Sequence, residues 1–166
     1  MKRIDTKKLV VLALMIALNI VSSRLIPAVN VWNTKIAFTF ITLVVTGYLY
    51  GPIYSGLVGG VGDLIGALLF PIGEFNPLFT LTAIMSGVIF GIFHKKNLEL
   101  SYVIIESLLN HILVTILLNS WFIAISYNAS FVALLATRSL QSIAMFVIEI
   151  ILITLLKPAI KRLGNF

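Results

Sequence analysis

The chain has 166 residues, of which 60% are hydrophobic and only 11% are charged, and its mean hydropathy is +1.09. A soluble fold of this size cannot bury so much apolar surface, so an ordinary cytosolic enzyme and a disordered protein are excluded. The net charge is +6 and there is no cysteine, which excludes disulfides, thiolate catalysis and cysteine-based metal sites. We therefore expect a single membrane domain over residues 1–166.

Six apolar segments are predicted to cross the membrane as α-helices, because roughly 20 apolar residues span a bilayer. The first follows a basic N-terminus, and we expect it to be retained because no signal-peptide cleavage site precedes Arg24. Later helices are expected to end at Gly51-Pro52, at Pro71-Ile72-Gly73 and at Lys157-Pro158. In chain order, the predicted helices cover residues 7–25, 36–50, 53–70, 78–93, 101–126 and 130–156. The predicted fold class is an all-α bundle of six transmembrane helices.

The basic residues predict the orientation of this bundle. With six spans and both termini in the cytoplasm, nine of the twelve lysines and arginines lie on the cytoplasmic side. These nine are Lys2, Arg3, Lys7, Lys8, Lys95, Lys96, Lys157, Lys161 and Arg162. The positive charge therefore indicates membrane topology, and no nucleic-acid partner is expected.

Glycines recur at a spacing of four residues in the third and fourth predicted helices. The pairs are Gly56 with Gly60, Gly62 with Gly66, and Gly87 with Gly91. Small residues at this spacing allow membrane helices to approach closely. We interpret all three pairs as packing contacts inside the bundle.

No motif for catalysis is present. The two histidines, His94 and His111, lie in no metal-binding pattern, and the chain has neither a phosphate-binding loop nor a nucleophile–base arrangement. We expect no enzyme activity, no cofactor and no metal. Uphill transport of a solute would need a gradient or another polypeptide.

Charged residues in the last predicted helix point to a polar interior. Arg138, Gln141, Met145 and Glu149 share one helix face, which must point into protein. Arg138 has two interpretations: a structural pair with a carboxylate, or a contact with a ligand entering from the outer side. Glu149 lies nearer the cytoplasmic half, and we assign it to packing or partner contacts.

The other polar residues within predicted spans are Asp63, Glu106, Asn110 and Asn119. Asp63 is expected to bond with neighbouring backbone or hydroxyl groups, and Glu106 to serve packing or partner contacts. Asn119 lies about 140° around a straight helix from the face of Glu106 and Asn110. Asn119 and that face can line one cavity only if the helix is distorted.

Three outer loops combine aromatic and amide side chains: residues 29–35, 70–77 and 127–129. Aromatic faces stack on flat rings, and amides pair with the donors and acceptors at ring edges. The loops would therefore suit a flat, polar heteroaromatic ligand. Aromatic belts at the membrane interface produce the same composition without a ligand.

Three ordered motifs carry a family resemblance: Gly-Tyr-Leu-Tyr-Gly-Pro at 47–52, Gly-Asp-Leu-Ile-Gly-Ala-Leu-Leu-Phe-Pro-Ile-Gly at 62–73, and Phe-Thr-Leu-Thr-Ala at 79–83. Leu-Asn-Ser-Trp at 118–121 and the segment 133–141 agree as well. The chain resembles the substrate-binding S components of energy-coupling factor (ECF) vitamin transporters, and most closely the folate type. Ala13 and Ala17 resemble the family's AxxxA contact motif.

The resemblance implies a multi-pass protein of a prokaryotic cell membrane that binds a vitamin near its outer face and catalyses nothing. It implies a complex with a transmembrane coupling subunit and two ATPase subunits, with Ala13 and Ala17 at the contact with the coupling subunit. The matching polar positions are Arg24, Lys35, Asn119, Trp121, Arg138 and Gln141.

For folate, we expect the pterin to stack on aromatic side chains, with its edge at Asn119 or Gln141. The aromatic candidates are Trp32, Phe75 and Trp121. The carboxylates of folate are expected near Arg24 or Lys35, because charge-assisted hydrogen bonds are the strong ones.

The chain also departs from the folate-type pattern. Residues 35–42 read Lys-Ile-Ala-Phe-Thr-Phe-Ile-Thr where that pattern is close to Arg-Ile-Ser-Phe-Gly-Phe-Ile-Pro, and Ala136 replaces a frequent proline. An alternative ligand is therefore a pyridoxine-like or hydroxymethylpyrimidine vitamin or precursor. Two other classes are a membrane enzyme acting on lipid, for which no paired acidic or histidine motif exists, and a structural subunit without a ligand.

Overall fold

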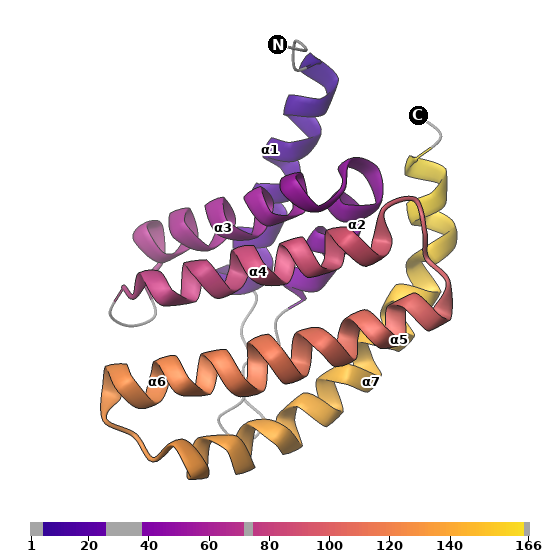
Figure 1. Cartoon of the computed structure of the whole chain (residues 1–166). Coiled ribbons are helices and arrows are strands. Elements are labelled where there is room, and N and C mark those ends of the chain that lie inside the picture. The colour runs from indigo at the N-terminus through magenta and orange to yellow at the C-terminus, as the bar shows by residue number, and fades with distance from the viewer. Residues whose placement is uncertain (1–4, 26–37, 72–74, 165–166) are drawn as a thin grey trace.

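The computed structural model describes residues 5–25, 38–71 and 75–164 (Figure 1). This part of the chain is entirely helical apart from short connections, and it contains no strand. It forms six helical rods, which confirms the predicted all-α, six-helix architecture. The rods are α1 (Thr6–Ile20) with the π-helix η1 (Val21–Leu25), α2 (Thr39–Tyr50), α3 (Pro52–Leu69), α4 (Pro77–His94), α5 (Leu100–Leu109) with the π-helix η2 (Asn110–Leu118) and α6 (Asn119–Tyr127), and α7 (Phe131–Leu163).

Five of these rods are long and apolar enough to cross a membrane, and α2 is the short one. The 12 residues of α2 span only about 18 Å at 1.5 Å per residue. This helix is also the most enclosed, with every residue from Thr42 to Gly47 buried. It contacts α1, α3, α4 and α7, so it forms the centre of the bundle. The predicted start at residue 36 was too early, because Phe38 is not helical and residues 36–37 lie outside the described part.

Glycines let α3 and α4 pack with their backbones in contact, as their spacing predicted. A Cβ atom at Gly87 would overlap the backbone of Ser55, and one at Gly91 would overlap the backbone of Pro52. A Cβ atom at Gly62 would lie 2.7 Å from the side-chain oxygen of Asn19 on α1. Helices α1 to α4 therefore form one close-packed group.

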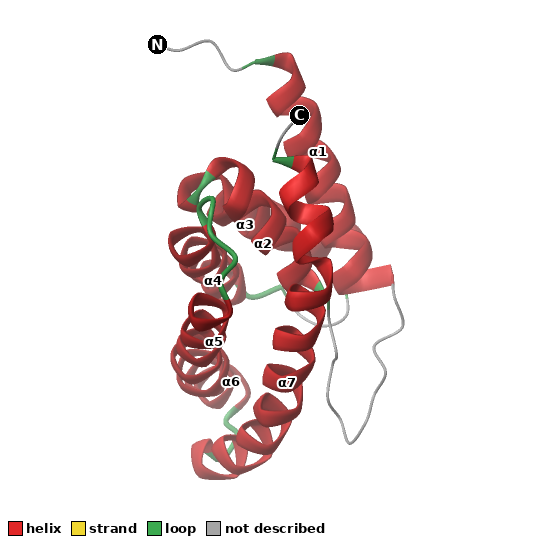
Figure 2. Cartoon of the chain, turned by 90° about the vertical axis from the view of Figure 1, so that its right-hand side faces the viewer, coloured by secondary structure: helices red, strands yellow, loops and turns green. Residues whose placement is uncertain are grey.

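The last helix does not end at Lys157-Pro158, so that predicted boundary was wrong. Helix α7 continues through Pro158 to Leu163. A proline removes one backbone hydrogen bond from a helix interior, but the residues beyond it are anchored, because Ile160 is buried in the hydrophobic core. Figure 2 shows that α7 is curved along its length.

The beginning of α1, the α4–α5 connection and the end of α7 lie at the same end of the bundle (Figure 1). Lys8 and Gly164 line the same cleft there, and the Lys8 ammonium lies 3.4 Å from the centre of the Tyr54 ring. The Lys96 N–H donates to the carbonyl of Tyr48 at 3.3 Å. The described parts of the basic segments that were predicted to share one side of the membrane thus meet at one end, which we call the basic end.

The remaining rods, α5–η2–α6 and α7, form an antiparallel pair beside the α1–α4 group (Figures 1 and 2). They contact that group through α2 and α4. Polar side chains and a smaller number of large apolar ones lie between the two parts, and cavities open there.

Candidate functional site

Two adjoining cavities lie between the α1–α4 group and the α5–α7 pair. The first, which we call the α7 cavity, has a volume of about 440 Å³ and reaches from Arg138 to Glu149 along α7. The second, the α1 cavity, has a volume of about 480 Å³ and is lined by Arg24 on η1 and Asp63 on α3. The two cavities share the lining residues Thr39, Leu43, Ser86, Asn119 and Arg138. Together they have the size of a site for a small organic ligand.

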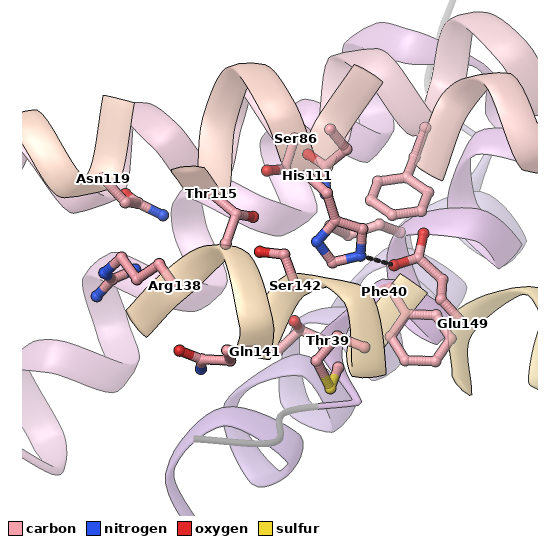
Figure 3. A pocket seen from close by; sticks show the side chains of 14 residues that line it. Thr39, Phe40, Ser86, His111, Thr115, Asn119, Arg138, Gln141, Ser142 and Glu149 are labelled. Atoms are coloured by element: carbon pink, nitrogen blue, oxygen red, sulfur yellow. Dashed lines mark ion pairs between the residues drawn. The ribbon is translucent and has the colours of Figure 1, made fainter. Parts of the chain in front are cut away.

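Polar residues of α7 line the first cavity along one face. Arg138, Gln141, Met145 and Glu149, which were predicted to share a face that points into protein, all line the α7 cavity (Figure 3). Arg138 and Asn119 lie at one end of this cavity, and His111 and Glu149 lie at the other. We call the second end the Glu149 end.

The π-helix η2 brings Asn110 and Asn119 into the same cavity. The N–H of Asn119 donates to the carbonyl of Val114, five residues earlier, which is the π-helical pattern. A π-helix has about 4.4 residues per turn, so nine residues make close to two full turns. The sequence predicted that Asn119 and Asn110 could line one cavity only if the helix were distorted, and the π-helix is this distortion. The other π-helix, η1, carries Arg24 into the α1 cavity.

The two arginines of the cavities differ in their surroundings. Arg24 Nη2 lies 3.0 Å from Asp63 Oδ1, and Asp63 also accepts a hydrogen bond of 2.8 Å from the hydroxyl of Thr80. The expected hydroxyl partner of Asp63 is thus present, together with a cation that the sequence did not suggest. Arg138 forms no ion pair within the described ranges, so the structural Arg138–carboxylate pair is not observed there.

A buried acid–base cluster extends from the α7 cavity toward the basic end. Glu149 Oε1 accepts a hydrogen bond of 2.8 Å from the hydroxyl of Ser107, and Glu149 Oε2 lies 3.2 Å from Nε2 of His111. In the same cluster, Glu106 Oε2 lies 3.2 Å from Nε2 of His94. Glu106 is packed away from the cavity, as expected, but Glu149 and His111 line it. The face shared with Arg138 was the signal that could have placed Glu149 in the site.

Two of the predicted binding residues, Phe75 and Trp121, do not line these cavities, and the structure does not describe two others. Trp32 and Lys35 lie outside the described residues. Phe75 is 47% exposed and Trp121 is 53% exposed, and neither lines the α7 or the α1 cavity. The structure instead brings together Arg24, Asn119, Arg138 and Gln141. Ala13 and Ala17 lie on the exposed side of α1.

The family model described as "ECF transporter, substrate-specific component" matches residues 7–159. The chain belongs to this family. It is therefore a component of a membrane transporter and not an enzyme, in agreement with the absence of catalytic motifs.

Two curated proteins and one solved structure are similar to this chain. The "Folate transporter FolT" of Clostridium novyi (strain NT) is 33% identical over 106 residues, which cover 63% of this chain and 60% of that protein. The "Folate transporter FolT" of Leuconostoc mesenteroides subsp. mesenteroides is 35% identical over 100 residues, which cover 60% of this chain and 53% of that protein. The chain thus spans little more than half the length of these curated relatives. A solved structure, "Crystal structure of FolT bound with folic acid", has 33% identity and a TM-score of 0.79, and the match covers 88% of each chain.

Proposed function

We propose that this S component binds folate in the two adjoining cavities and delivers it through an ECF complex of a prokaryotic cell membrane. The similarity to proteins described as folate transporters, and to a structure described as bound with folic acid, supports the choice of folate. The basic end faces the cytoplasm in this proposal, because loops rich in lysine and arginine stay on that side.

The observation that carries the proposal is the position of Arg138. Its side chain lines both cavities and has no acidic partner in the described part of the chain. An unpaired cation within a membrane-embedded bundle is costly, so it marks a functional site by default. A carboxylate of folate would provide the missing counter-charge through charge-assisted hydrogen bonds. Arg138 thus replaces Arg24 as our candidate for this contact, since Arg24 already pairs with Asp63.

Coupling to transport is assigned to the lipid-facing side of α1. This helix is barely covered by the rest of the bundle, and Ala13 and Ala17 are exposed on it. Two alanines one turn apart leave a shallow surface against which another membrane helix can pack closely. The partners in the proposal are a transmembrane coupling subunit and two ATPase subunits, which supply the ATP hydrolysis for which this sequence has no motif.

Calorimetric titration of the purified protein in detergent or nanodiscs tests the ligand. Folate should bind with a dissociation constant below about 1 μM, which corresponds to more than about 8 kcal/mol. Pyridoxine and hydroxymethylpyrimidine should not bind at the same concentrations. Binding of either of these without binding of folate would overturn the folate assignment but leave the family intact.

A further inference from the structure

The Glu149 end of the α7 cavity has the character of a subsite for a flat ring. Phe40 lies there (Figure 3), and Phe90 lines the same cavity with its ring centre 6.2 Å from that of His94 in the acid–base cluster. Both side chains are almost completely buried, with exposures of 5% and 1%. The imidazole of His111 lies at the same end (Figure 3). No aromatic residue other than these three is among the described residues that line the α7 cavity. Within the α7 cavity, the surfaces on which a ring can stack are therefore concentrated at the end away from Arg138, whereas the α1 cavity is lined by Phe79.

Several polar atoms that line the α7 cavity have no partner within the described structure. They are the side-chain oxygens of Asn110 and Asn119, Nδ1 of His111 and the hydroxyl of Ser142. Asn110, His111 and Ser142 are only 8%, 8% and 3% exposed. Buried polar groups are nearly always hydrogen-bonded, so each of these atoms calls for a partner. A polar ligand that fills the cavity would supply it.

The charged groups of the cavity are arranged along α7 with opposite signs. Arg138 and Glu149 are 11 residues apart (149 − 138) on the same helix, which corresponds to about 16 Å along the axis. Folate has a matching polarity. Its glutamate carries carboxylates, and its pterin has an edge with two adjacent donors, the N3–H and the 2-amino group. A carboxylate accepts two parallel hydrogen bonds from such an edge.

We propose that Glu149 is the specificity-determining residue for the ring, and that it accepts hydrogen bonds from the N3–H and 2-amino groups of a 2-amino-4-oxo heteroaromatic ligand. The ring then packs against Phe40 and Phe90, and the remainder of the ligand extends toward Arg138. Ser107 positions the carboxylate through its 2.8 Å hydrogen bond to Oε1. This assignment rests on the proposed function, since it orients folate within the site, with the ring at the Glu149 end rather than near Asn119 or Gln141.

The test compares folate with its 2-oxo analogue, in which a carbonyl replaces the 2-amino group. The analogue presents one donor and one acceptor, which match the oxygen and the NH₂ of a glutamine but not a carboxylate. The wild-type protein should prefer folate at least tenfold. In Glu149→Gln this preference should fall at least tenfold or reverse, as measured by calorimetry with both ligands.

Glu106→Gln is the matched control, because Glu106 is equally buried and belongs to the same acid–base cluster but does not line the α7 cavity. It should leave the ratio of the two affinities unchanged, whatever its effect on stability. A Glu149→Gln protein that binds both ligands with the wild-type ratio would show that Glu149 is structural.

If Glu149→Gln does not fold, the ratio of the wild-type affinities for folate and its 2-oxo analogue still tests the role of Glu149. Equal affinity of the wild type for folate and its 2-oxo analogue overturns the role of Glu149. Failure of the wild type to bind folate at all overturns the proposed function instead, so the two failures are distinguishable.

Discussion

Removing the charge of Arg138 should weaken the binding of folate much more than the binding of a neutral ligand of the same shape. The matched ligand is folate diamide, in which both carboxylates are replaced by uncharged amides. Arg138 lines both cavities, and its side chain is partly buried. A hydrogen bond to a charged group contributes about 1.5–3 kcal/mol. Arg138→Gln should therefore reduce the affinity for folate about 10- to 100-fold, since each 1.4 kcal/mol is about tenfold.

Arg24→Gln is the comparison variant, because Arg24 lines only the α1 cavity and already has an acidic partner. Its guanidinium lies 3.0 Å from Asp63, and without it Asp63 keeps only the hydrogen bond from Thr80 among its described contacts. The expected effect of Arg24→Gln is a lower melting temperature, with equal changes in affinity for folate and its diamide.

Calorimetry with the two ligands and the two variants, together with thermal unfolding of the ligand-free proteins, measures both effects. The reasoning is refuted if Arg24→Gln selectively weakens folate while Arg138→Gln weakens folate and the diamide equally. In that case Arg24 would be the carboxylate contact that the sequence predicted, and the ion pair with Asp63 would have to open when folate binds.

Three further outcomes are expected. Ala13→Trp or Ala17→Trp should prevent assembly of the ECF complex and abolish vitamin uptake, because the bulky side chain keeps another helix at a distance. The isolated variant should still bind folate. Unchanged uptake would place the docking surface elsewhere. Gly87→Val should prevent stable folding, as judged by detergent size-exclusion profiles, because its side chain would overlap the backbone of Ser55; Gly66→Ala, whose Cβ would meet the Arg24 side chain at 3.3 Å, should fold. Cells that express this chain alone should bind folate without accumulating it. Co-expression with the coupling subunit and ATPases should produce ATP-dependent uptake. The expectation is contradicted if the chain alone concentrates folate and an uncoupler abolishes this uptake.

Composition and periodicity were sufficient to predict the architecture. An apolar chain with little charge must place its surface in lipid, and a lipid-exposed backbone must satisfy its own hydrogen bonds, which helices do. Six helices, the close packing of the glycines and the inward face of Arg138 and Glu149 follow from these constraints. These are local or periodic properties, which can be inferred directly from the sequence.

The end of α7 was not predictable in the same way. Proline is a local signal for a helix end, but Ile160 is buried against residues that lie far away in the sequence. Packing of this kind is a tertiary contact, and it overrides the local preference. The sequence also placed the start of α2 too early, at residue 36, whereas the helix begins at Thr39.

The site itself was decided by the tertiary structure. The sequence identified Arg24 and Arg138 as cations of the outer half, but only the fold shows that Arg24 meets Asp63 on another helix while Arg138 has no such partner within the described residues. Trp121 is prominent in the sequence, yet the helix turns it away from both cavities. Two π-helical segments carry Arg24, Asn110 and His111, and a change of helical pitch re-aims every side chain that follows it. Sequence periodicity assumes one pitch throughout, so the residues that face each other across these cavities could be read only from the folded chain.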